Sequence, residues 1–424
     1  MIMNKFLTTI ITLSLMHGLL ISGCTSGCPS NSSVIVKTGI EVLRDDHFKC
    51  LEGKRVGLLT NPTGVDSRLK SSIDILFEAP GVNLVALYSP EHGIRGDVTA
   101  GGQVTDSIEP LTGLPVYSLY GATKKPTPEM LKEIDVLVYD MQDIGCRSYT
   151  YISTMGLAME AAAENNIEFV VLDRPNPLGG LRFEGQPNVE PHLVSLVSQF
   201  PITYVHGFTV GELATFLNEE GLLKDKMRCK LTVVKMDGWE RTMNFEATGL
   251  PWVITSPHIP HPATAYFYAI SGILGELFAG YIGIGYTLPF ELFGTEWIDA
   301  EKLAANLNAL KIPGAMFRPM HFKPYYSSHK DVYLHGIQTY ITDFDQIPLT
   351  LIQFYVLQEC YKLYPDKNVF ELCAPSRLNM FDKVCGTARI RETFSQTFTV
   401  ASIQEIWDED VEKFQEKAKR YFLY

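Results

Sequence analysis

The chain has 424 residues, of which 46% are hydrophobic and 20% are charged, a composition typical of folded proteins and unlike that of disordered ones. Its formal net charge of -12 excludes the excess of Lys and Arg with which nucleic-acid-binding proteins meet phosphate, so we expect no nucleic-acid partner. The length is sufficient for two packed cores.

The first residues have the pattern of a secretion signal. Lys5 precedes the apolar run 6–20, and small residues lead from there to Cys24. A run of this length is typical of a signal-peptide core and is too short to span a bilayer. The pattern resembles a bacterial lipoprotein signal, which implies removal of residues 1–23 and acylation of Cys24.

Residues 24–33 are small and polar with Gly and Pro among them, as in a flexible tether, so the folded body is expected to begin near Val34. No acidic residue follows Cys24 directly, and such signals resemble those of outer-membrane lipoproteins that face the periplasm. We therefore expect a protein of the cell envelope, held at the membrane by a lipid anchor on Cys24.

The cysteines from Cys50 onward lack C-x-x-C spacing, which argues against a zinc cage. In an oxidising compartment Cys373 and Cys385 are the nearest candidates for a disulfide, and buried free thiols are the alternative.

Short apolar runs rich in β-branched residues lie in the first half of the body, at residues 55–60, 83–88, 134–139 and 167–172. Segments of helical length lie between several of them, at 69–77, 128–132 and 152–165. This alternation predicts βαβ units in a Rossmann-like, doubly wound and mostly parallel sheet.

Further elements complete two predicted domains. A helix is expected at 209–219, where Thr209 and Glu212 have capping-box spacing, with strands at 231–236 and 252–255. The first domain then covers residues 34–256. An apolar segment at 265–284, helices at 299–310, 349–364 and 403–421, and a strand at 332–342 predict a smaller α+β domain over residues 257–424.

Polar residues follow each of the four apolar runs directly, in the segments 61–64, 89–93, 140–143 and 173–176. The carboxyl ends of the strands in an open α/β sheet line its ligand crevice, so these segments are expected to meet at one site. The candidate site residues in and just after these segments are Asn61, Glu91, His92, Arg95, Asp140, Gln142, Asp143, Arg147, Tyr149, Asp173, Arg174 and Asn176.

Several well-known chemistries lack their motifs. The chain has no G-x-S-x-G elbow, no Walker A loop and no G-x-G-x-x-G after the first strand, so no nucleotide cofactor is expected. His258 and His261 have H-x-x-H spacing, but the prolines around them exclude a helical metal motif. We expect no metal or organic cofactor, and a metal-dependent hydrolase that uses these histidines is the weaker alternative.

Four segments together carry a family resemblance: 57–64, 89–93, 140–151 and 172–180 resemble the NamZ-type exo-β-N-acetylmuramidases. The likeness extends through 239–241, 248–252, 289–291, 297–299 and 381–383. It implies a Rossmann-like domain and a smaller domain with the site in the cleft between them. It also implies exo-lytic removal of terminal β-linked N-acetylmuramic acid from peptidoglycan fragments, with Glu91 as the catalytic glutamate and without a cofactor.

Glycoside hydrolysis assigns roles to these residues, because it requires a carboxylic acid for the leaving oxygen and a second carboxylate or an equivalent group. Glu91 lies in a Pro-Glu-His-Gly turn and fits the acid/base role, with His92 as helper. One of Asp140, Asp143 and Asp173 is expected to be the second group. The structural alternatives are that Glu91 caps a segment, that Asp143 pairs with Arg147, and that Asp173 holds Arg174 or a neighbouring amide. Retention or inversion stays open.

The lactyl carboxylate of muramic acid calls for a guanidinium group, for which Arg95, Arg147 and Arg174 are candidates. We favour Arg147 or Arg174. Tyr149, Tyr151 and Trp252 are candidates for aromatic platforms under the sugar, with core packing as the alternative.

The chain departs from the family pattern in one place. Many members read Glu-Gly-Thr-Asn and Gly-Arg-Gly-Thr where this chain has Glu276-Leu277-Phe278-Ala279 and Gly283-Ile284-Gly285-Tyr286. We keep Glu276 as a substrate-binding candidate. The departure suggests a differently decorated substrate, weaker binding, lost catalysis or a repacked domain interface. A non-catalytic lipoprotein that binds wall fragments is therefore the alternative function.

Overall fold

A computed structural model describes residues 35–99, 101–326 and 329–424 of the chain. The predicted signal peptide, the tether and Cys24 lie outside these residues, so their assignments stay predictions. Within the described ranges, no helix has both the length and the apolar character that crossing a bilayer requires.

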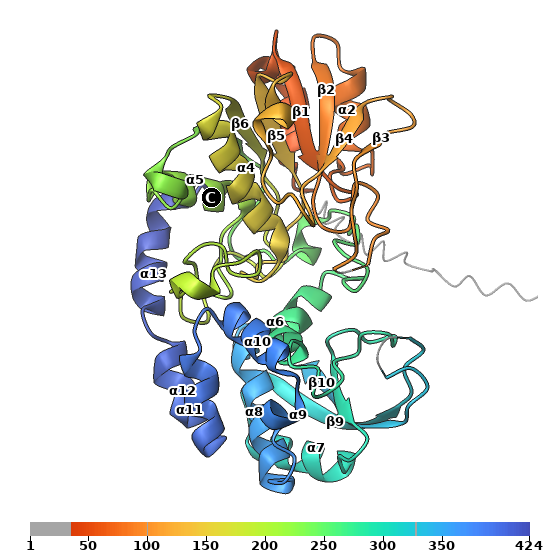
Figure 1. Ribbon diagram of the computed structural model, residues 1–424, viewed down its shortest axis with the longest axis vertical. Coiled ribbons are helices and arrows are strands. Elements are labelled where there is room, and N and C mark those ends of the chain that lie inside the picture. The colour runs from red at the N-terminus through yellow and green to blue at the C-terminus, as the bar shows by residue number, and fades with distance from the viewer. Residues whose placement is uncertain (1–34, 100, 327–328) are drawn as a thin grey trace, which may run out of the picture. The chain divides into compact units, whose positions relative to one another are not determined.

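A seven-stranded sheet forms the first half of the body (Figure 1). The strands stand in the order β3 (Ser107–Ile108), β4 (Pro115–Ser118), β2 (Asn83–Ser89), β1 (Arg55–Thr60), β5 (Val136–Asp140), β6 (Glu168–Leu172) and β7 (Lys230–Val234). All neighbours pair in parallel except the short edge strand β3. The predicted mostly parallel α/β sheet is confirmed.

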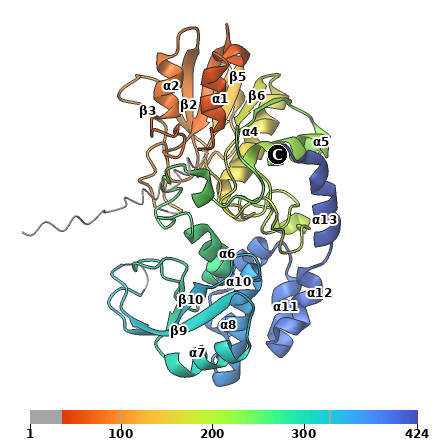
Figure 2. The same cartoon turned by 180° about the vertical axis from the view of Figure 1, so that it is seen from behind.

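Helices cover both faces of this sheet. Helices α1 (Gly39–Asp45) and α2 (Ser72–Glu78) pack on one face, and α3 (Pro128–Leu131), α4 (Thr150–Glu164) and α5 (Val210–Glu219) pack on the other. Figure 2 shows the face with α1 and α2, and Figure 1 the face with α4. The alternation of side chains along each strand explains the two cores. In β5, for example, Val136 and Val138 belong to the first core and Leu137 and Tyr139 to the second.

The predicted start of α5 is confirmed in detail, because Thr209 and Glu212 form the reciprocal hydrogen bonds of a capping box. The strand expected at 252–255 is wrong. This segment follows Pro251 and pairs with no strand; instead the Trp252 indole donates to the Ile259 carbonyl at 3.1 Å and its ring packs edge-on against Phe245. An apolar run can thus be buried through its side chains alone.

The second half of the body is an antiparallel sheet with helices around it. Its strands stand in the order β8 (Leu292–Thr295), β10 (Leu334–Ile341) and β9 (Ala315–Phe322). Its helices are α6 (Thr264–Gly275), α7 (Ala300–Ala309), α8 (Leu349–Leu363), α9 (Val369–Leu372), α10 (Pro375–Cys385), α11 (Arg389–Thr397), α12 (Val400–Trp407) and α13 (Val411–Ala418). The helix expected at 403–421 is two helices, because Asp410 (φ 60°) interrupts it in the left-handed region.

The end of the chain returns to the first sheet. Helix α13 leads back to α5 in both views (Figures 1 and 2), and the Phe422 ring lies 3.3 Å from the Arg241 guanidinium carbon. The Tyr424 hydroxyl donates to Asp173 at 2.8 Å, at the end of β6. The six described cysteines are free, so the candidate disulfide between Cys373 and Cys385 is not formed.

Candidate active site

The four predicted polar segments meet at one edge of the large sheet. Strands β1, β2, β5 and β6 end at Thr60, Ser89, Asp140 and Leu172, and all four run in the same direction. The carboxyl-edge location of these segments is confirmed. The individual side chains, however, have very different surroundings.

Glu91 belongs to a tight turn directly after β2. His92 (φ 72°) and Gly93 (φ 79°) are both in the left-handed region, and the Gly93 amide donates to the Pro90 carbonyl at 3.1 Å. A non-glycine residue in this region is strained, and such strain is common at functional sites. The His92 ring is held by Nδ1, which lies 2.7 Å from the Val98 carbonyl and donates to it, since a carbonyl only accepts.

The Glu91 carboxylate is partly exposed and accepts hydrogen bonds from neutral groups on separate segments. Thr150 Oγ1 donates at 2.8 Å and the Gly101 amide at 3.1 Å, and the Tyr120 hydroxyl is a further partner. Among the described residues, no Lys, Arg or His forms an ion pair with Glu91. The carboxylate is therefore oriented without a fixed counter-charge, which suits a group that must both give and take a proton.

Tyr120 is a site residue that the sequence reading missed. It lies just beyond β4, so it follows the same strand-end rule as Glu91, but β4 is too short to stand out as an apolar run. Burial, and then the charge of Glu91 and the hydrogen bond to it, raise the pKa of Tyr120. Its hydroxyl thus remains a donor at neutral pH.

A second acidic group comes from the other half of the body. Glu276 follows α6, and Arg377 of α10 donates from Nη2 to Glu276 Oε2 at 2.5 Å and from Nε to the Glu276 carbonyl at 2.6 Å. The two side chains keep 31% and 26% of their surface accessible. Burial raises the pKa of Glu276, Arg377 lowers it, and the negative charge of Glu91 raises it. Glu276 and Glu91 are therefore within electrostatic reach of each other.

Tyr149 joins α6 to the start of α4, which carries Thr150. Its ring packs edge-on against Tyr268 of α6 at 5.8 Å, and its hydroxyl donates to Thr255 at 2.8 Å. Only 7% of Tyr149 is exposed, and Tyr151 beside it is more deeply buried still. These rings are structural partners of the site, so the prediction that they offer a flat surface to the sugar does not match their burial.

Asp140 is a fully buried ion-pair partner. Arg174 donates to its carboxylate from Nε at 2.5 Å and from Nη2 at 3.0 Å, and Ser72 supplies a further short hydrogen bond. The Asp140 side chain has no exposed surface and that of Arg174 only 5%. The two groups are occupied by each other, so their surroundings favour a structural ion pair over the predicted catalytic role of Asp140 and the predicted binding role of Arg174.

Asp143 is also buried inside the protein. Its Oδ2 accepts the Gly145 amide at 2.7 Å and lies 3.1 Å from Nε2 of the fully buried His206. Asp143 does not pair with Arg147. The expected ion pair between these two residues is therefore wrong, because His206 takes the place of Arg147. This burial speaks against the predicted catalytic role.

Asp173 accepts four hydrogen bonds in the interior: from the amides of Arg174 and Gly211, from Thr209 and from Tyr424, at 2.7–2.9 Å. Burial raises the pKa of Asp173 to about 6, although these donors lower it. The carboxylate joins the end of β6, the start of α5 and the last residue. This enclosure speaks against the predicted contact with substrate. The alternative, in which Asp173 holds a neighbouring amide, is found in the hydrogen bonds from Arg174 and Gly211.

Arg147 fastens the second half of the body to the first. Its two terminal nitrogens donate to the carbonyls of Gln186, Ile202, Val384 and Cys385 at 2.7–3.1 Å. Burial lowers its pKa to about 10. With 1% exposure and both terminal nitrogens bound to carbonyls, the Arg147 guanidinium has no accessible donor for a lactyl carboxylate, so its surroundings favour a structural role over the predicted binding role. Its buried Nε has no hydrogen-bond partner among the described residues.

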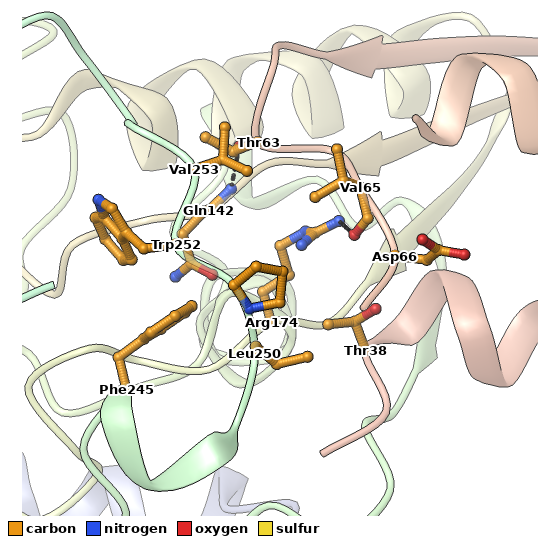
Figure 3. Close-up of a pocket in the computed structure, with 11 residues that line it drawn as sticks. Thr38, Thr63, Val65, Asp66, Gln142, Arg174, Phe245, Leu250, Trp252 and Val253 are labelled. Carbon is orange, nitrogen blue, oxygen red and sulfur yellow. Dashed lines mark hydrogen bonds between the residues drawn. The ribbon is translucent and has the colours of Figure 1, made fainter. Parts of the chain in front are cut away.

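Figure 3 shows the pocket where β1 and β5 end, with Gln142, Arg174 and Thr63 among its lining residues. Its volume is about 20 Å³, which suits a water molecule and not a sugar. Gln142 donates to the Asp143 and Pro175 carbonyls, and Asn176 to that of Phe208. The amide groups of Gln142 and Asn176 thus hold loops at this part of the edge, and their predicted substrate-binding role stays a prediction.

A larger pocket of about 250 Å³ lies beside the loops after β1 and β2, and Asn61 and Arg95 line it. Arg95 has 58% of its side chain exposed while pairing with Glu109 at 3.1 Å. Asn61 holds Thr63 through Oδ1, and its buried Nδ2 lacks a hydrogen-bond partner in the described structure. Of the three predicted arginines, Arg95 alone has an accessible guanidinium.

His258 lies near the Glu91 turn. Its pKa is lowered by burial and then by the neighbouring His92. Tyr326 Oη lies 3.4 Å from its Nδ1, and the two rings stack at 6.1 Å. Across the described residues, no three His, Cys, Asp or Glu side chains are grouped as metal ligands would be.

Two family models match consecutive stretches of the chain. "Exo-beta-N-acetylmuramidase NamZ, N-terminal" matches residues 56–263, and the corresponding C-terminal model matches residues 266–424. The peptidoglycan β-N-acetylmuramidase NamZ of Bacillus subtilis (strain 168) is 43% identical over 425 residues, which cover 100% of both chains.

Solved structures agree with this likeness. A DUF1343 family protein of Bacteroides fragilis is 59% identical with a TM-score of 0.89, over 92% of this chain and 99% of that one. A second DUF1343 family protein of the same species is 29% identical with a TM-score of 0.72, over the same shares.

Proposed function

We propose that this chain, which belongs to the NamZ family of exo-β-N-acetylmuramidases, is an exo-lytic glycoside hydrolase that releases terminal β-linked N-acetylmuramic acid from peptidoglycan fragments. The observation that carries the proposal is the state of Glu91. It is the one predicted strand-end carboxylate that is partly exposed and has no cationic partner among the described residues.

Glu91 is proposed as the acid that protonates the leaving glycosidic oxygen. Thr150, Tyr120 and the Gly101 amide orient it through neutral hydrogen bonds, so its proton can be transferred without breaking an ion pair. The strained His92 keeps the turn in one conformation through its bond to Val98.

We propose Glu276 as the second carboxylate, in place of the three buried aspartates. Arg377 fixes its position and its charge while part of the side chain stays accessible. A negative charge opposite the acid stabilises the oxocarbenium-like transition state or activates water, and the distance between the two carboxyl groups decides between retention and inversion.

We propose Arg95 for the lactyl carboxylate, because it alone among the predicted arginines is accessible. A guanidinium recognises a carboxylate through paired donors. Arg95→Met is expected to raise KM for muramic-acid-terminated substrates and to leave kcat within a factor of about three. An unchanged KM would contradict this assignment.

The reaction is tested with two isomeric disaccharides. The body from residue 34 onward is incubated with a disaccharide that ends in N-acetylmuramic acid and with one that ends in N-acetylglucosamine. We expect release from the first alone. Equal cleavage of both would contradict the specificity, and tight binding without release would support the alternative of a wall-fragment-binding lipoprotein.

The role of Glu276 is tested with Glu276→Gln. We expect kcat to fall by about 10²-fold or more, in the range of lost acid or base groups. Asp382→Asn is the matched control, because Asp382 of α10 is likewise a carboxylate paired with an arginine, Arg391 of α11, at 2.8 Å. The assignment fails if both variants retain activity per folded molecule.

We propose that the chain is anchored in the cell envelope through an acylated Cys24, facing the periplasm from the outer membrane. The support is the signal-like sequence before Cys24 and the absence of an acidic residue directly after it. In cells fed labelled palmitate, Cys24→Ser is expected to abolish label and membrane association, while Cys28→Ser retains both. Soluble protein in the wild type would contradict the anchor.

A further inference from the structure

Aromatic side chains are unusually exposed on the loop between β9 and β10. Tyr325 and Tyr326 have 61% and 51% of their surface accessible, although each ring also packs against another ring. Tyr333, at the far end of the loop, is 68% exposed. A single exposed tyrosine is ordinary, but two adjacent exposed rings that are each supported by another ring call for a role.

The Tyr325 ring is held from one side. It stacks on Tyr286 with ring centres 5.4 Å apart and planes inclined by 24°, and its amide donates to the Gly285 carbonyl at 2.8 Å. Tyr325 nevertheless keeps 61% of its surface exposed. A ring fixed in this way offers a flat surface and loses little conformational entropy when a ligand covers it.

The Tyr326 ring is held by the turn that carries His258. The two rings stack with planes inclined by 25°, in addition to the contact between Tyr326 Oη and His258 Nδ1. His92 contributes, after burial, to the lowered pKa of His258, and His92 follows Glu91 directly in the chain. The Tyr326 ring thus packs on His258, and the electrostatic influence of His92 on His258 links this loop with the Glu91 turn.

Gly285 makes this arrangement sterically feasible. Its φ is 101°, and a Cβ at this position would lie 2.4 Å from the Tyr326 carbonyl oxygen. Gly285 and Tyr286 belong to the segment in which the chain departs from the family pattern. In this chain the departing segment thus supports the two exposed rings, which gives it a role beyond filling an interface.

The chemistry of the Tyr325 and Tyr326 rings indicates which class of ligand they suit. Pyranose rings present C–H groups on their faces, and these pack well on aromatic surfaces. No Lys or Arg among the described residues forms a cation–π contact with Tyr325 or Tyr326. Lys323, which precedes them in the loop, lies over the Tyr333 ring instead. A neutral aromatic surface suits an uncharged amino-sugar better than a lactyl carboxylate or an acidic peptide stem.

We propose that Tyr325 and Tyr326 form a subsite that binds the leaving saccharide, stacking on the N-acetylglucosamine side of the scissile bond. This proposal rests on the proposed function. In an exo-acting enzyme the terminal sugar occupies the catalytic site and the rest of the chain runs outward over the surface, where the two rings receive it.

The test compares substrates with different leaving groups. Tyr325→Ala and Tyr326→Ala are assayed on a muramic-acid-terminated tetrasaccharide, on the disaccharide and on β-N-acetylmuramyl fluoride, which has no leaving saccharide. For the tetrasaccharide we expect kcat/KM to fall about five- to tenfold, in the range of one aromatic contact. For the fluoride we expect less than about a twofold change. Tyr325→Phe and Tyr326→Phe should retain the stacking and most of the activity.

Tyr333→Ala is the matched control, since it removes an equally exposed ring from the same loop. Equal losses on all three substrates, or no loss on any, would overturn the subsite. A loss confined to substrates with a peptide stem would assign the rings to the stem and also overturn it.

If the proposed function is wrong, the wild type releases no N-acetylmuramic acid, even from the fluoride, and this result differs from a failure of the subsite alone. Binding of N,N′-diacetylchitobiose, followed by calorimetry, then tests the subsite without turnover. We expect both alanine variants to weaken it about fivefold or more and Tyr333→Ala to leave it unchanged. Equal affinity in all variants would overturn the proposal.

Discussion

Glu91 and Asp140 occupy equivalent places in the fold and have opposite surroundings. They belong to the carboxyl ends of β2 and β5, the two strands that flank β1. Glu91 is partly exposed and is held by neutral donors, whereas Asp140 has no exposed side chain and is clamped by Arg174. The end of a parallel strand therefore brings polar groups to a site, but the local counter-charge and burial decide which of them remains free to react.

Glu91→Gln should show the largest effect on activity. Removing the exchangeable proton is expected to lower kcat by about 10²- to 10⁴-fold, which is the usual contribution of a general acid or base. The melting temperature should change little, because the amide can keep the hydrogen bond from Thr150. Full activity in release assays would show that Glu91 is not the acid.

Asp140→Asn should show the largest effect on stability. Loss of the charge leaves the Arg174 guanidinium buried without a counter-ion, which typically costs about 3–5 kcal/mol in the free energy of unfolding. Chemical denaturation measures it. The double variant Asp140→Leu with Arg174→Met should recover much of this loss, because it removes both charges together. A loss of turnover in Asp140→Asn that exceeds its loss of folded protein would restore a catalytic role for Asp140.

Asp173 predicts a pH dependence of stability. Its pKa is raised to about 6 in the folded protein, so between pH 4 and 6 the folded state binds more protons than the unfolded state. The contribution of this group therefore stabilises the fold at low pH and is lost as the pH rises towards 6, by up to about 3 kcal/mol. The measurement is the difference in unfolding free energy between wild type and Asp173→Asn at several pH values. From about pH 4 to about pH 7, the unfolding free energy of the wild type should fall relative to that of Asp173→Asn. A difference that stays constant over this range would contradict the raised pKa.

Tyr120→Phe should show the smallest effect. It removes one neutral donor from Glu91 and leaves the ring, so kcat is expected to fall about three- to tenfold, equivalent to about 1 kcal/mol. The pH profile of kcat should also move, because the donor favours the charged form of its acceptor. Tyr117→Phe on β4 serves as the control, and a similar loss in both variants would point to packing and not to Glu91.

The candidate site shows how much of an active site a local sequence pattern can predict. The strand-end rule, the family resemblance and the structure agree on Glu91. The three arginines chosen by the same rule differ in their accessibility. Arg147 is enclosed by carbonyls from 39 to 238 residues away, and Arg174 is enclosed by its own ion pair, while Arg95 stays accessible. A sequence pattern locates a strand end, but it contains no information about which groups from distant segments close over it.

The sequence by itself determined the parallel strands, the helices between them and the segments that meet at the carboxyl edge, because alternation and periodicity of apolar residues are local properties. It also singled out Glu91. Only the tertiary structure decided the partners of these residues. The pair of Glu276 with Arg377 joins positions 101 residues apart, and Tyr326 reaches His258 across 68 residues. Burial and ion pairing depend on such distant contacts, so they appear only once the chain is folded.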